Sequence, residues 1–350
     1  MSEQRRNLDV AVVIVTYKSA QLATESLRSL AMERDAPDLR IRAIVVDNAS
    51  GDLPQIAQAV AANNWSDWVA LVPAPRNGGF AYGNNLGMER AYADASPAYI
   101  YLLNPDTQVR RGAIAALTRF LESHVNVGIA GSSFENPDGS DWPIAFRFPT
   151  LLSEVDRGLE LGIATRLLRR WVVPRVMNRT AEQVDWISGA AMMIRPEVLA
   201  TVGGMDENYF LYFEETDFCQ RAKRAGFPTW YVPESRVMHV GGKSTNVTSA
   251  DGARRPLPAY WFESRRRYFA VTFGIGSAML IDLVAILACS LGWLKQLITR
   301  RQRSLNPHYI RDLIRHSVLW PKNRDLPATR SVFKVIAAAP VAERDVGSLT

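Results

Sequence analysis

Apolar runs of strand length alternate with amphipathic stretches along the first 135 residues of the chain. Residues 10–17 (VAVVIVTY) and 99–103 (YIYLL) are continuously apolar, whereas the segments after such runs space their apolar residues three and four apart. Continuous apolar strands are typical of a sheet buried on both faces, and the amphipathic segments predict helices that cover it. We therefore expect an α/β fold with a mostly parallel sheet flanked by helices.

Polar residues stand where several predicted strands end. Thr16-Tyr17, Asp47-Asn48 and Asn104-Pro105-Asp106 each follow an apolar run directly. In open α/β sheets, ligands bind beyond the carboxyl ends of the strands. The pattern therefore predicts a binding site at this edge of the sheet.

The character of the chain changes from Pro258 onward. Residues 271–294 carry a single charge, Asp282, so this run is long enough to span a bilayer, although an aspartate at its centre is costly. Three alternatives stay open: an in-plane or peripheral membrane helix, a true span, and a core helix. We expect a main domain over residues 1–250 and a helical, membrane-associating region over residues 251–350. The residues that fall near one helix face, which could pack on protein while the other meets lipid, are Gly274, Ala278, Asp282, Ala285 and Cys289.

The composition is that of a folded soluble protein, with 47% hydrophobic and 22% charged residues in a chain of 350. The net charge is +6, and basic residues cluster at positions 254–255, 265–267 and 300–303. Such clusters suit an anionic partner such as a lipid headgroup, a diphosphate or nucleic acid, unless they form only a solvated face. Two cysteines without metal-ligand spacing and the lack of a visible secretion signal indicate a reducing compartment.

Several familiar motifs do not fit. Residues 241–245 (GGKST) resemble the end of a P-loop, but Val237 stands where the upstream glycine is required. Residues 76–84 (RNGGFAYGN) are glycine-rich without matching the dinucleotide fingerprint, and the sequence has no HExxH and no nucleophilic serine in an elbow. Hydrolase and dehydrogenase functions are therefore disfavoured.

The strand-end residues suggest their own chemistry. Asp47 can accept hydrogen bonds from a base or a ribose, or it can form the turn of its DNAS loop. Residues 76–79 (RNGG) offer a cation, an amide and backbone N–H groups ahead of a helix, which suits a nucleotide or a plain loop. Asp106 lies on a rigid turn, and oxygen ligands of this kind suit Mg²⁺ or Mn²⁺ holding a diphosphate.

Residues 208–218 (NYFLYFEETDF) place three carboxylates behind a run of aromatic residues. One explanation is the first turn of a helix, where acids suit the positive end of the helix dipole. The other is that a cation or a proton in transit is accommodated there, because carboxylates otherwise repel one another and resist leaving water.

A series of segments then occurs in one order: VVIVTYKS, VVDNAS, RNGGFAYGNN, LLNPDT, WISGAAMMIR, GGMDENYFLYFEETDFCQRAKRAG and HVGGKST. In this order and spacing the chain resembles the inverting glycosyltransferases of family 2 over about residues 9–245. The Asn-Pro-Asp in place of the more usual Asp-x-Asp, together with ESRRRYF at 263–269, is similar to the bacterial rhamnosyltransferase-like branch. The resemblance implies the GT-A fold.

The resemblance also implies roles for single residues. Asp106 and His239 would bind the Mg²⁺ or Mn²⁺ ion that bridges the donor diphosphate, and Asp47 would contact the nucleotide base. Glu215 stands at the usual position of the general base, although the family commonly shows Glu-Asp-x-Asp where this chain has Glu-Glu-Thr-Asp, so Glu214 could share the role. The candidate residues for binding the nucleotide sugar are Thr16, Asp47, Asn48, Arg76, Asn77, Gly78, Asn104 and Asp217.

The implied activity is transfer of rhamnose from dTDP-rhamnose, with inversion, to a lipid-linked or polysaccharide acceptor in cell-envelope glycan synthesis. Arg265, Arg266 and Arg267 would meet the acceptor diphosphate at the cytoplasmic face of the membrane, where the protein would be peripheral. Nucleic acid is not expected as a partner, and the oligomeric state is left open. The alternatives are a transferase of another sugar, a sugar nucleotidyltransferase, which needs a basic glycine-rich loop that VTYKSAQ lacks, and a non-catalytic binding scaffold.

Overall fold

The computed structural model describes residues 8–34, 39–142, 144–239, 256–299, 305–306 and 308–333. The P-loop-like GGKST segment, the expected domain boundary near residue 250 and the basic clusters at 254–255 and 300–303 lie outside these ranges.

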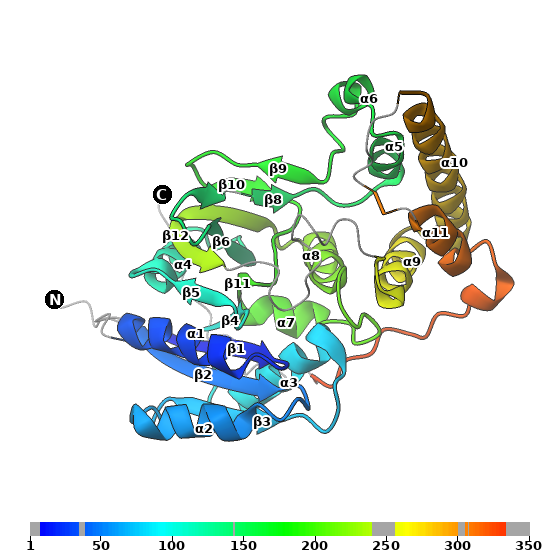
Figure 1. Ribbon diagram of the computed structural model, residues 1–350. Helices are drawn as coiled ribbons and strands as arrows, with labels where there is room; N and C mark the ends of the chain where they lie inside the picture. The colour runs from blue at the N-terminus through cyan, green and yellow to red at the C-terminus, as the bar shows by residue number, and fades with distance from the viewer. Residues whose placement is uncertain are drawn as a thin grey trace, which may run out of the picture.

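One large sheet forms the centre of the molecule (Figure 1), with the strand order β10-β12-β6-β11-β4-β1-β2-β3. Its long strands all point the same way, because β1 is parallel to β2 and β4, β2 to β3, β12 to β6, and only β11 is reversed between β4 and β6. The expected mostly parallel sheet is confirmed. The strands with a common direction are β1 (Leu8–Thr16), β2 (Leu39–Asp47), β3 (Val69–Pro73), β4 (Tyr99–Leu103), β6 (Ile129–Glu135) and β12 (Thr229–His239).

The reversed strand β11 (Ala191–Ile194) lies inside the sheet, between β4 and β6. Three further short antiparallel strands pair with β12 or β6: β5 (Thr107–Val109), β7 (Asp141–Trp142) and β10 (Glu182–Val184). A separate ribbon pairs β8 (Ile144–Phe146) with β9 (Pro174–Val176).

Helices cover both faces of the sheet, which explains why its strands read as continuous apolar runs. On β1, Val12 faces one core cluster and Val13 the other, and both side chains are fully buried. The first face carries α1 (Ala20–Glu33), α2 (Leu53–Ala62) and α4 (Ala113–Ser123). The second face carries α3 (Gly79–Asp94), α7 (Pro196–Val202) and α8 (Glu214–Arg224).

A group of helices forms the side of the molecule farthest from α2 and β3 (right in Figure 1). It consists of α5 (Leu151–Leu159), α6 (Gly162–Leu167), α9 (Ala259–Phe273), α10 (Ile275–Thr299), α11 (Tyr309–His316) and the 3-10 helix η2 (Pro321–Asn323). The apolar run from 271 to 294 is divided between α9 and α10 at Gly274, whose φ is +84°. By length and composition alone, α10 could cross a membrane. It packs closely on α5, since a Cβ on Gly292 would lie 2.2 Å from the carbonyl oxygen of Gly158.

Buried ion pairs join this helical group, and they correct the expectation that Arg265 and Arg267 face an acceptor, whereas the same role of Arg266 stays a prediction. The guanidinium of Arg265, 1% exposed, lies 2.7 Å from Glu154 and 2.5 Å from Asp282. Arg267 is 3% exposed and pairs with Asp206, while Arg266 donates to the carbonyl oxygen of His316. Burial of a charge is costly unless it is paired, so the guanidinium groups of Arg265 and Arg267 form structural ion pairs with these carboxylates.

Candidate active site

A cavity of about 160 Å³ opens at the carboxyl ends of β1, β2 and β4, where the strand-end residues predicted a site. Its walls combine the glycine-rich turn before α3, the end of β4 and the loop before α8. The lining residues are Val15, Tyr17, Ser19, Asn48, Asn77, Gly79, Phe80, Asn104, Pro105, Phe210 and Leu211.

A larger cavity, about 770 Å³, lies along β12 at the far edge of the sheet. In its lining, Asp141 pairs with Arg179 at 2.9 Å and with Arg236 at 3.4 Å. It lies away from the carboxyl ends of β1, β2 and β4, where the strand-end residues predicted the site.

Asp47, expected to contact a base, instead forms the turn after β2. One carboxylate oxygen accepts from the backbone N–H and the hydroxyl of Ser50, and the other accepts from the N–H groups of Gly51 and Asp52. Burial opposes ionisation, but these hydrogen bonds outweigh it and lower the pKa of Asp47. Thr16 does not line the cavity either, since its hydroxyl donates to Asp52 at 2.6 Å.

Asn48 holds the glycine-rich turn. Its side-chain oxygen accepts from Gly78 N–H at 3.2 Å and its amide donates to the carbonyl oxygen of Gly79 at 3.0 Å. Gly79 has a φ of +86°, and a Cβ there would lie 1.9 Å from the carbonyl oxygen of Phe210. Only glycine suits position 79, because the turn there touches the loop before α8. Asn77, in the same turn, lines the cavity. Arg76 is exposed near the same turn.

Asp106 and His239 meet across two paired strands. Thr107 in β5 stands opposite His239 in β12, which places the imidazole beside the turn at the end of β4. His239 Nε2 lies 3.4 Å from Asp106 Oδ1, and the imidazole ring stacks on Trp142. Because Asn104 and Pro105 line the cavity, this pair lies next to it.

The loop before α8 enters the helix through a strained backbone. Tyr212 and Phe213 have φ values of +71° and +68°, a region that residues with a side chain rarely adopt. Glu214 and Glu215 follow at once as the first residues of α8. Such strain, about 1–3 kcal/mol per residue, is typical of functional sites.

The two glutamates differ in their surroundings. Glu214 is 2% exposed. Glu215 instead lies against Gly189: a Cβ added to Gly189 would be 3.8 Å from the Cβ of Glu215. The same added Cβ would be 2.8 Å from the ring of Phe80, which lines the cavity. Neither Oε2 atom has a hydrogen-bond partner among the described residues. Sequence position alone did not reveal this contact with Gly189 and Phe80.

Burial raises the pKa of both carboxyl groups. For Glu214 the negative charge of Glu215 adds to burial, and together they raise its pKa well above the usual range. For Glu215 burial is partly offset by backbone hydrogen bonds, including one from Gly189, and its pKa is about 7. Glu215 is therefore the group that can exchange a proton near neutral pH.

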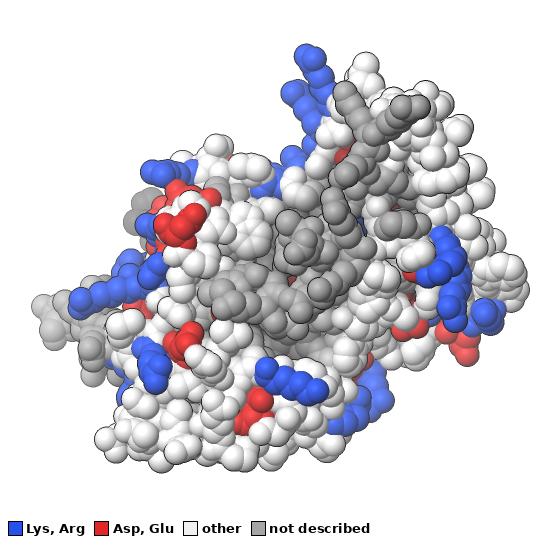
Figure 2. Space-filling view, viewed as in Figure 1, with Lys and Arg blue, Asp and Glu red and all other residues white. Residues whose placement is uncertain are grey.

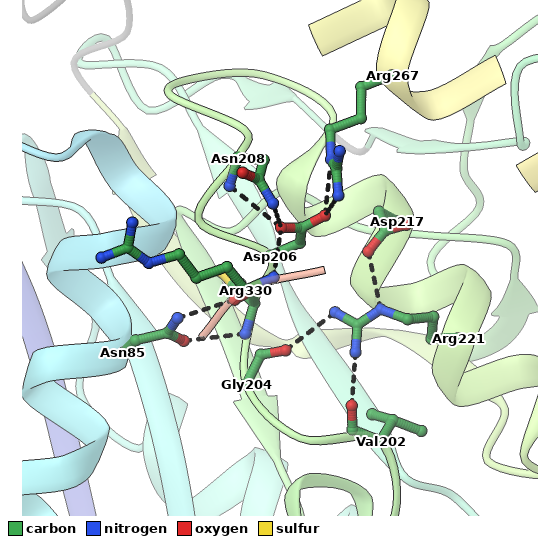
Figure 3. Close-up of polar contacts among 10 residues, drawn as sticks. Asn85, Val202, Gly204, Asp206, Asn208, Asp217, Arg221, Arg267 and Arg330 are labelled. Carbon is green, nitrogen blue, oxygen red and sulfur yellow. Dashed lines mark hydrogen bonds and ion pairs between the residues drawn. The ribbon is translucent and has the colours of Figure 1, made fainter. Parts of the chain in front are cut away.

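Figure 3 shows how the loop from 203 to 213 is held. The carboxylate of Asp206 accepts hydrogen bonds from Nε and Nη2 of Arg267 and from the backbone N–H and side-chain amide of Asn208. The Asn85 side chain bonds both the N–H and the carbonyl oxygen of Met205, at 2.9 and 2.8 Å. These buried contacts fix the loop that leads into Glu214.

Asp217 belongs to the same support and not to the cavity. Its carboxylate pairs at 2.8 Å with Arg221, whose other nitrogens donate to the carbonyl oxygens of Val202 and Gly204 (Figure 3). The expectation that Asp217 binds the nucleotide sugar is not met in this arrangement, because the residue is 3% exposed and does not line the cavity.

Residues 7–256 match the family described as Glycosyltransferase like family 2. The chain is a family 2 glycosyltransferase. The predicted family and enzyme class are thereby confirmed.

Relatives of this glycosyltransferase include rhamnosyltransferases. It is 29% identical to the N-acetylglucosaminyl-diphospho-decaprenol L-rhamnosyltransferase of Mycobacterium tuberculosis over 67% of this chain and 76% of that protein. It is 26% identical to rhamnosyltransferase WbbL of Escherichia coli K12 over 66% of this chain and 83% of that protein. The structure of the mannosyltransferase PcManGT of Pyrobaculum calidifontis in complex with GDP-Man and Mn²⁺ is similar in fold, with a TM-score of 0.52 and 15% sequence identity. The match covers 87% of this chain and 78% of the PcManGT chain. The predicted GT-A fold is confirmed.

Sequence reasoning missed three residues that organise the glycosyltransferase site. Asp52, in the same turn as Asp47, holds Thr16 and the N–H of Ser19. Asn85 in α3 holds the loop before α8 from far away in the sequence, and Asp206 within that loop binds the distant Arg267. Asp52 could have been found from its place in VVDNASGD, whereas nothing in the local sequence marks the partners of Asn85 or Asp206.

Proposed function

We propose that this glycosyltransferase moves rhamnose from dTDP-rhamnose to a lipid-linked or polysaccharide acceptor in cell-envelope glycan synthesis, with inversion at the anomeric carbon. The names of the Mycobacterium and Escherichia relatives support rhamnose as the sugar, and the former supports a lipid diphosphate as acceptor. The observation that carries the mechanism is a glutamate with a pKa near neutrality beside the cavity at the carboxyl ends of the strands.

Glu215 acts as the general base. A sugar hydroxyl is a poor nucleophile, so the ionised carboxylate accepts its proton as the oxygen attacks the anomeric carbon. The new C–O bond forms as the bond to the diphosphate oxygen breaks, and attack from the opposite side inverts the centre. Burial and the negative charge of Glu215 raise the pKa of Glu214 well above its usual range, which opposes ionisation of both carboxyl groups at once.

Asn48, Asn77, Gly78 and Asn104 form the donor side of the site. The three asparagines line the cavity, and Gly78 lies in the turn before α3, whose N-terminus suits a phosphate. Arg76 supplies a cation at the rim of this turn.

Asp106 and His239 fit a divalent ion. A carboxylate oxygen and an imidazole nitrogen 3.4 Å apart can share one cation, and both are ligands that Mn²⁺ accepts, while Mg²⁺ prefers the oxygen. No cluster of three metal-ligating side chains exists among the described residues, which suits an ion that takes its other ligands from water and the donor diphosphate. Such an ion supplies positive charge to the leaving diphosphate.

The peripheral location at the cytoplasmic face of the membrane is part of the proposal. It brings the enzyme to a lipid-linked acceptor, and α10 provides the apolar surface that such a location requires.

The test is a transfer assay with purified protein, dTDP-rhamnose, a polyprenyl-diphosphate-linked N-acetylglucosamine and either Mn²⁺ or Mg²⁺, with the product identified by mass. We expect one rhamnose added per acceptor. Transfer from another nucleotide sugar only would replace the sugar and keep the enzyme class. Formation of dTDP-rhamnose from dTTP and rhamnose 1-phosphate, without transfer, would overturn the proposal in favour of a nucleotidyltransferase.

A further inference from the structure

Exposed apolar side chains gather on the helical group and are scarce elsewhere. In the part of the chain that the structure describes, only Tyr17, Met32, Val125, Val176 and Phe210 are exposed large apolar residues outside positions 161–171 and 271–320. Within those two segments the large apolar residues that stand exposed are Leu161, Ile163, Leu167, Trp171, Val271, Phe273, Leu280, Leu283, Leu287, Leu291, Trp293, Leu294, Leu297, Ile298, Ile314 and Trp320.

The largest part of this surface is one face of α10. Successive apolar residues three or four positions apart line it, each with about half or more of its side chain exposed, and we call them the leucine ridge: Leu280, Leu283, Leu287, Leu291, Leu294 and Ile298. No exposed charge interrupts the ridge, because the two charged residues of α10 point away from solvent. Asp282 is 1% exposed, and Lys295 donates to the carbonyl oxygens of Leu159 and Glu160.

The opposite face of α10 is bound to protein, which argues against a membrane span. Asp282 accepts from Arg265, from the hydroxyl of Ser317 and from the N–H of Val318, so α9 and the segment after α11 are fixed to the helix at mid-length. Of the most apolar 18-residue window of α10, 39% is buried in the protein. A helix that carries such neighbours along one side cannot be surrounded by lipid, whereas it can lie in the membrane plane with its free side immersed.

Basic residues border the ridge. Arg166, Arg169 and Arg170 are exposed in or just after α6, which adjoins the end of α10 through Glu160. Arg311 and Arg315 are exposed on α11. Figure 2 shows the surface over α10 as white, with blue side chains over α6 and α11.

The exposed tryptophans occupy the same border. Trp171 follows α6, Trp293 lies near the end of α10, and Trp320 follows α11. Tryptophan prefers the level of the lipid headgroups, where its ring is apolar and its N–H stays hydrated.

We propose that α6, α10 and α11 form a monotopic docking surface for a bilayer that contains anionic lipid. The leucine ridge enters the boundary between headgroups and acyl chains with α10 parallel to the membrane, and the bordering arginines bind headgroup phosphates. This deepens the peripheral location proposed above, and it adds α6, which lies about 100 residues before α10, to the membrane-facing surface.

The test uses the full-length protein with preformed vesicles of phosphatidylcholine, alone or mixed with phosphatidylglycerol, in a co-sedimentation assay. The ridge variant carries Leu283→Gln, Leu287→Gln and Leu291→Gln, and the arginine variant carries Arg166→Gln, Arg169→Gln and Arg170→Gln. Met32→Gln, which removes an apolar side chain that is 64% exposed on α1, is the matched control.

We expect the wild type and the control to bind the anionic vesicles and to move to a second vesicle population on mixing. The ridge variant should lose at least about tenfold in binding to them, and the arginine variant should lose binding to anionic vesicles much more than to neutral ones. Circular dichroism and nucleotide-sugar affinity at wild-type levels would show that both variants fold.

Vesicle binding of the ridge variant equal to that of the wild type would overturn the inference, and so would a wild type that stays in the supernatant with both vesicles. Failure to exchange between vesicles would contradict the in-plane arrangement. A lipid-free dimer that the ridge substitutions separate, with vesicle binding unchanged, would assign the ridge to contact between two copies. Vesicle binding without rhamnosyl transfer would refute the proposed function and leave the docking surface standing.

Discussion

Replacing Arg265 by methionine tests the structural role that the fold assigns to this residue. The guanidinium of Arg265 is enclosed by Glu154 from α5 and Asp282 from α10, and each of the three residues is 3% exposed or less. Methionine fills a similar volume but leaves the two carboxylates buried without their cationic partner.

The expected loss of stability is large. Removing one member of a buried ion pair typically costs about 3–5 kcal/mol, because the remaining charge stays buried without its partner. Burial opposes ionisation of Glu154, and Arg265 reverses this and lowers its pKa, so the substitution should also raise the pKa of that carboxyl group. At no more than roughly 2–4 °C per kcal/mol for a chain of this size, the melting temperature should fall by up to about 6–20 °C.

Thermal unfolding followed by circular dichroism at pH 7.5 measures this effect. The matched control is Arg311→Met, because Arg311 forms an ion pair with Asp312 at 2.9 Å but its side chain is 66% exposed. The control should lose no more than about 1 kcal/mol. Adding Glu154→Gln and Asp282→Asn to Arg265→Met should recover part of the loss, since the buried charges are then removed together.

A melting temperature of Arg265→Met equal to that of Arg311→Met would refute this reasoning. If such a stable variant also lost transfer to a lipid-linked acceptor, Arg265 would act on the acceptor diphosphate after all.

Three further predictions concern the active site. The transfer rate should rise about tenfold per pH unit below pH 7 and level off above it, because only the ionised Glu215 accepts a proton and its pKa is about 7; a flat profile from pH 5.5 to 8 would contradict the assignment. Gly79→Ala should abolish donor binding in calorimetry, because its Cβ would lie 1.9 Å from the carbonyl oxygen of Phe210, while Gly139→Ala, with a φ of +80° and open space, should bind normally. Chelation with EDTA should stop transfer, Mn²⁺ or Mg²⁺ should restore it, and Asp106→Asn should raise the metal concentration required by about tenfold or more; restoration of this variant at the wild-type concentration would remove Asp106 from the metal site.

The sheet and the place of the site followed from local sequence. Continuous apolar runs such as residues 10–17 specify strands buried on both faces, and polar residues at strand ends such as Asn48 and Asn104 do line the cavity. Asp106 and His239 also come together, although more than 100 residues separate them in the sequence, because β5 pairs with β12. The family resemblance predicted that pairing, whereas periodicity alone did not.

The functions of single charged residues were harder to predict, because they depend on partners that are distant in sequence. Asp47 was open to two readings, and the turn explanation describes its four hydrogen bonds. Arg265 looked like part of an exposed basic cluster until Glu154, 111 residues earlier, was seen to face it. The same contacts support the in-plane placement of α10 proposed above, since the sequence shows the apolar side of a helix but not which side meets protein.

The most direct test of the central claim, that Glu215 takes the proton of the acceptor hydroxyl, compares Glu215→Gln with the wild type in single-turnover transfer at saturating donor. The account predicts a rate lower by about 10²–10⁴-fold with unchanged affinity for the nucleotide sugar. It also predicts a melting temperature at pH 8 at least as high as that of the wild type, because the fold raises the pKa of Glu215 from 4.5 to about 7. Stability therefore falls as pH rises between these two values and stays lower above them, whereas glutamine does not ionise. A transfer rate within a factor of about three of the wild type would contradict the claim, and so would loss of donor affinity in place of rate.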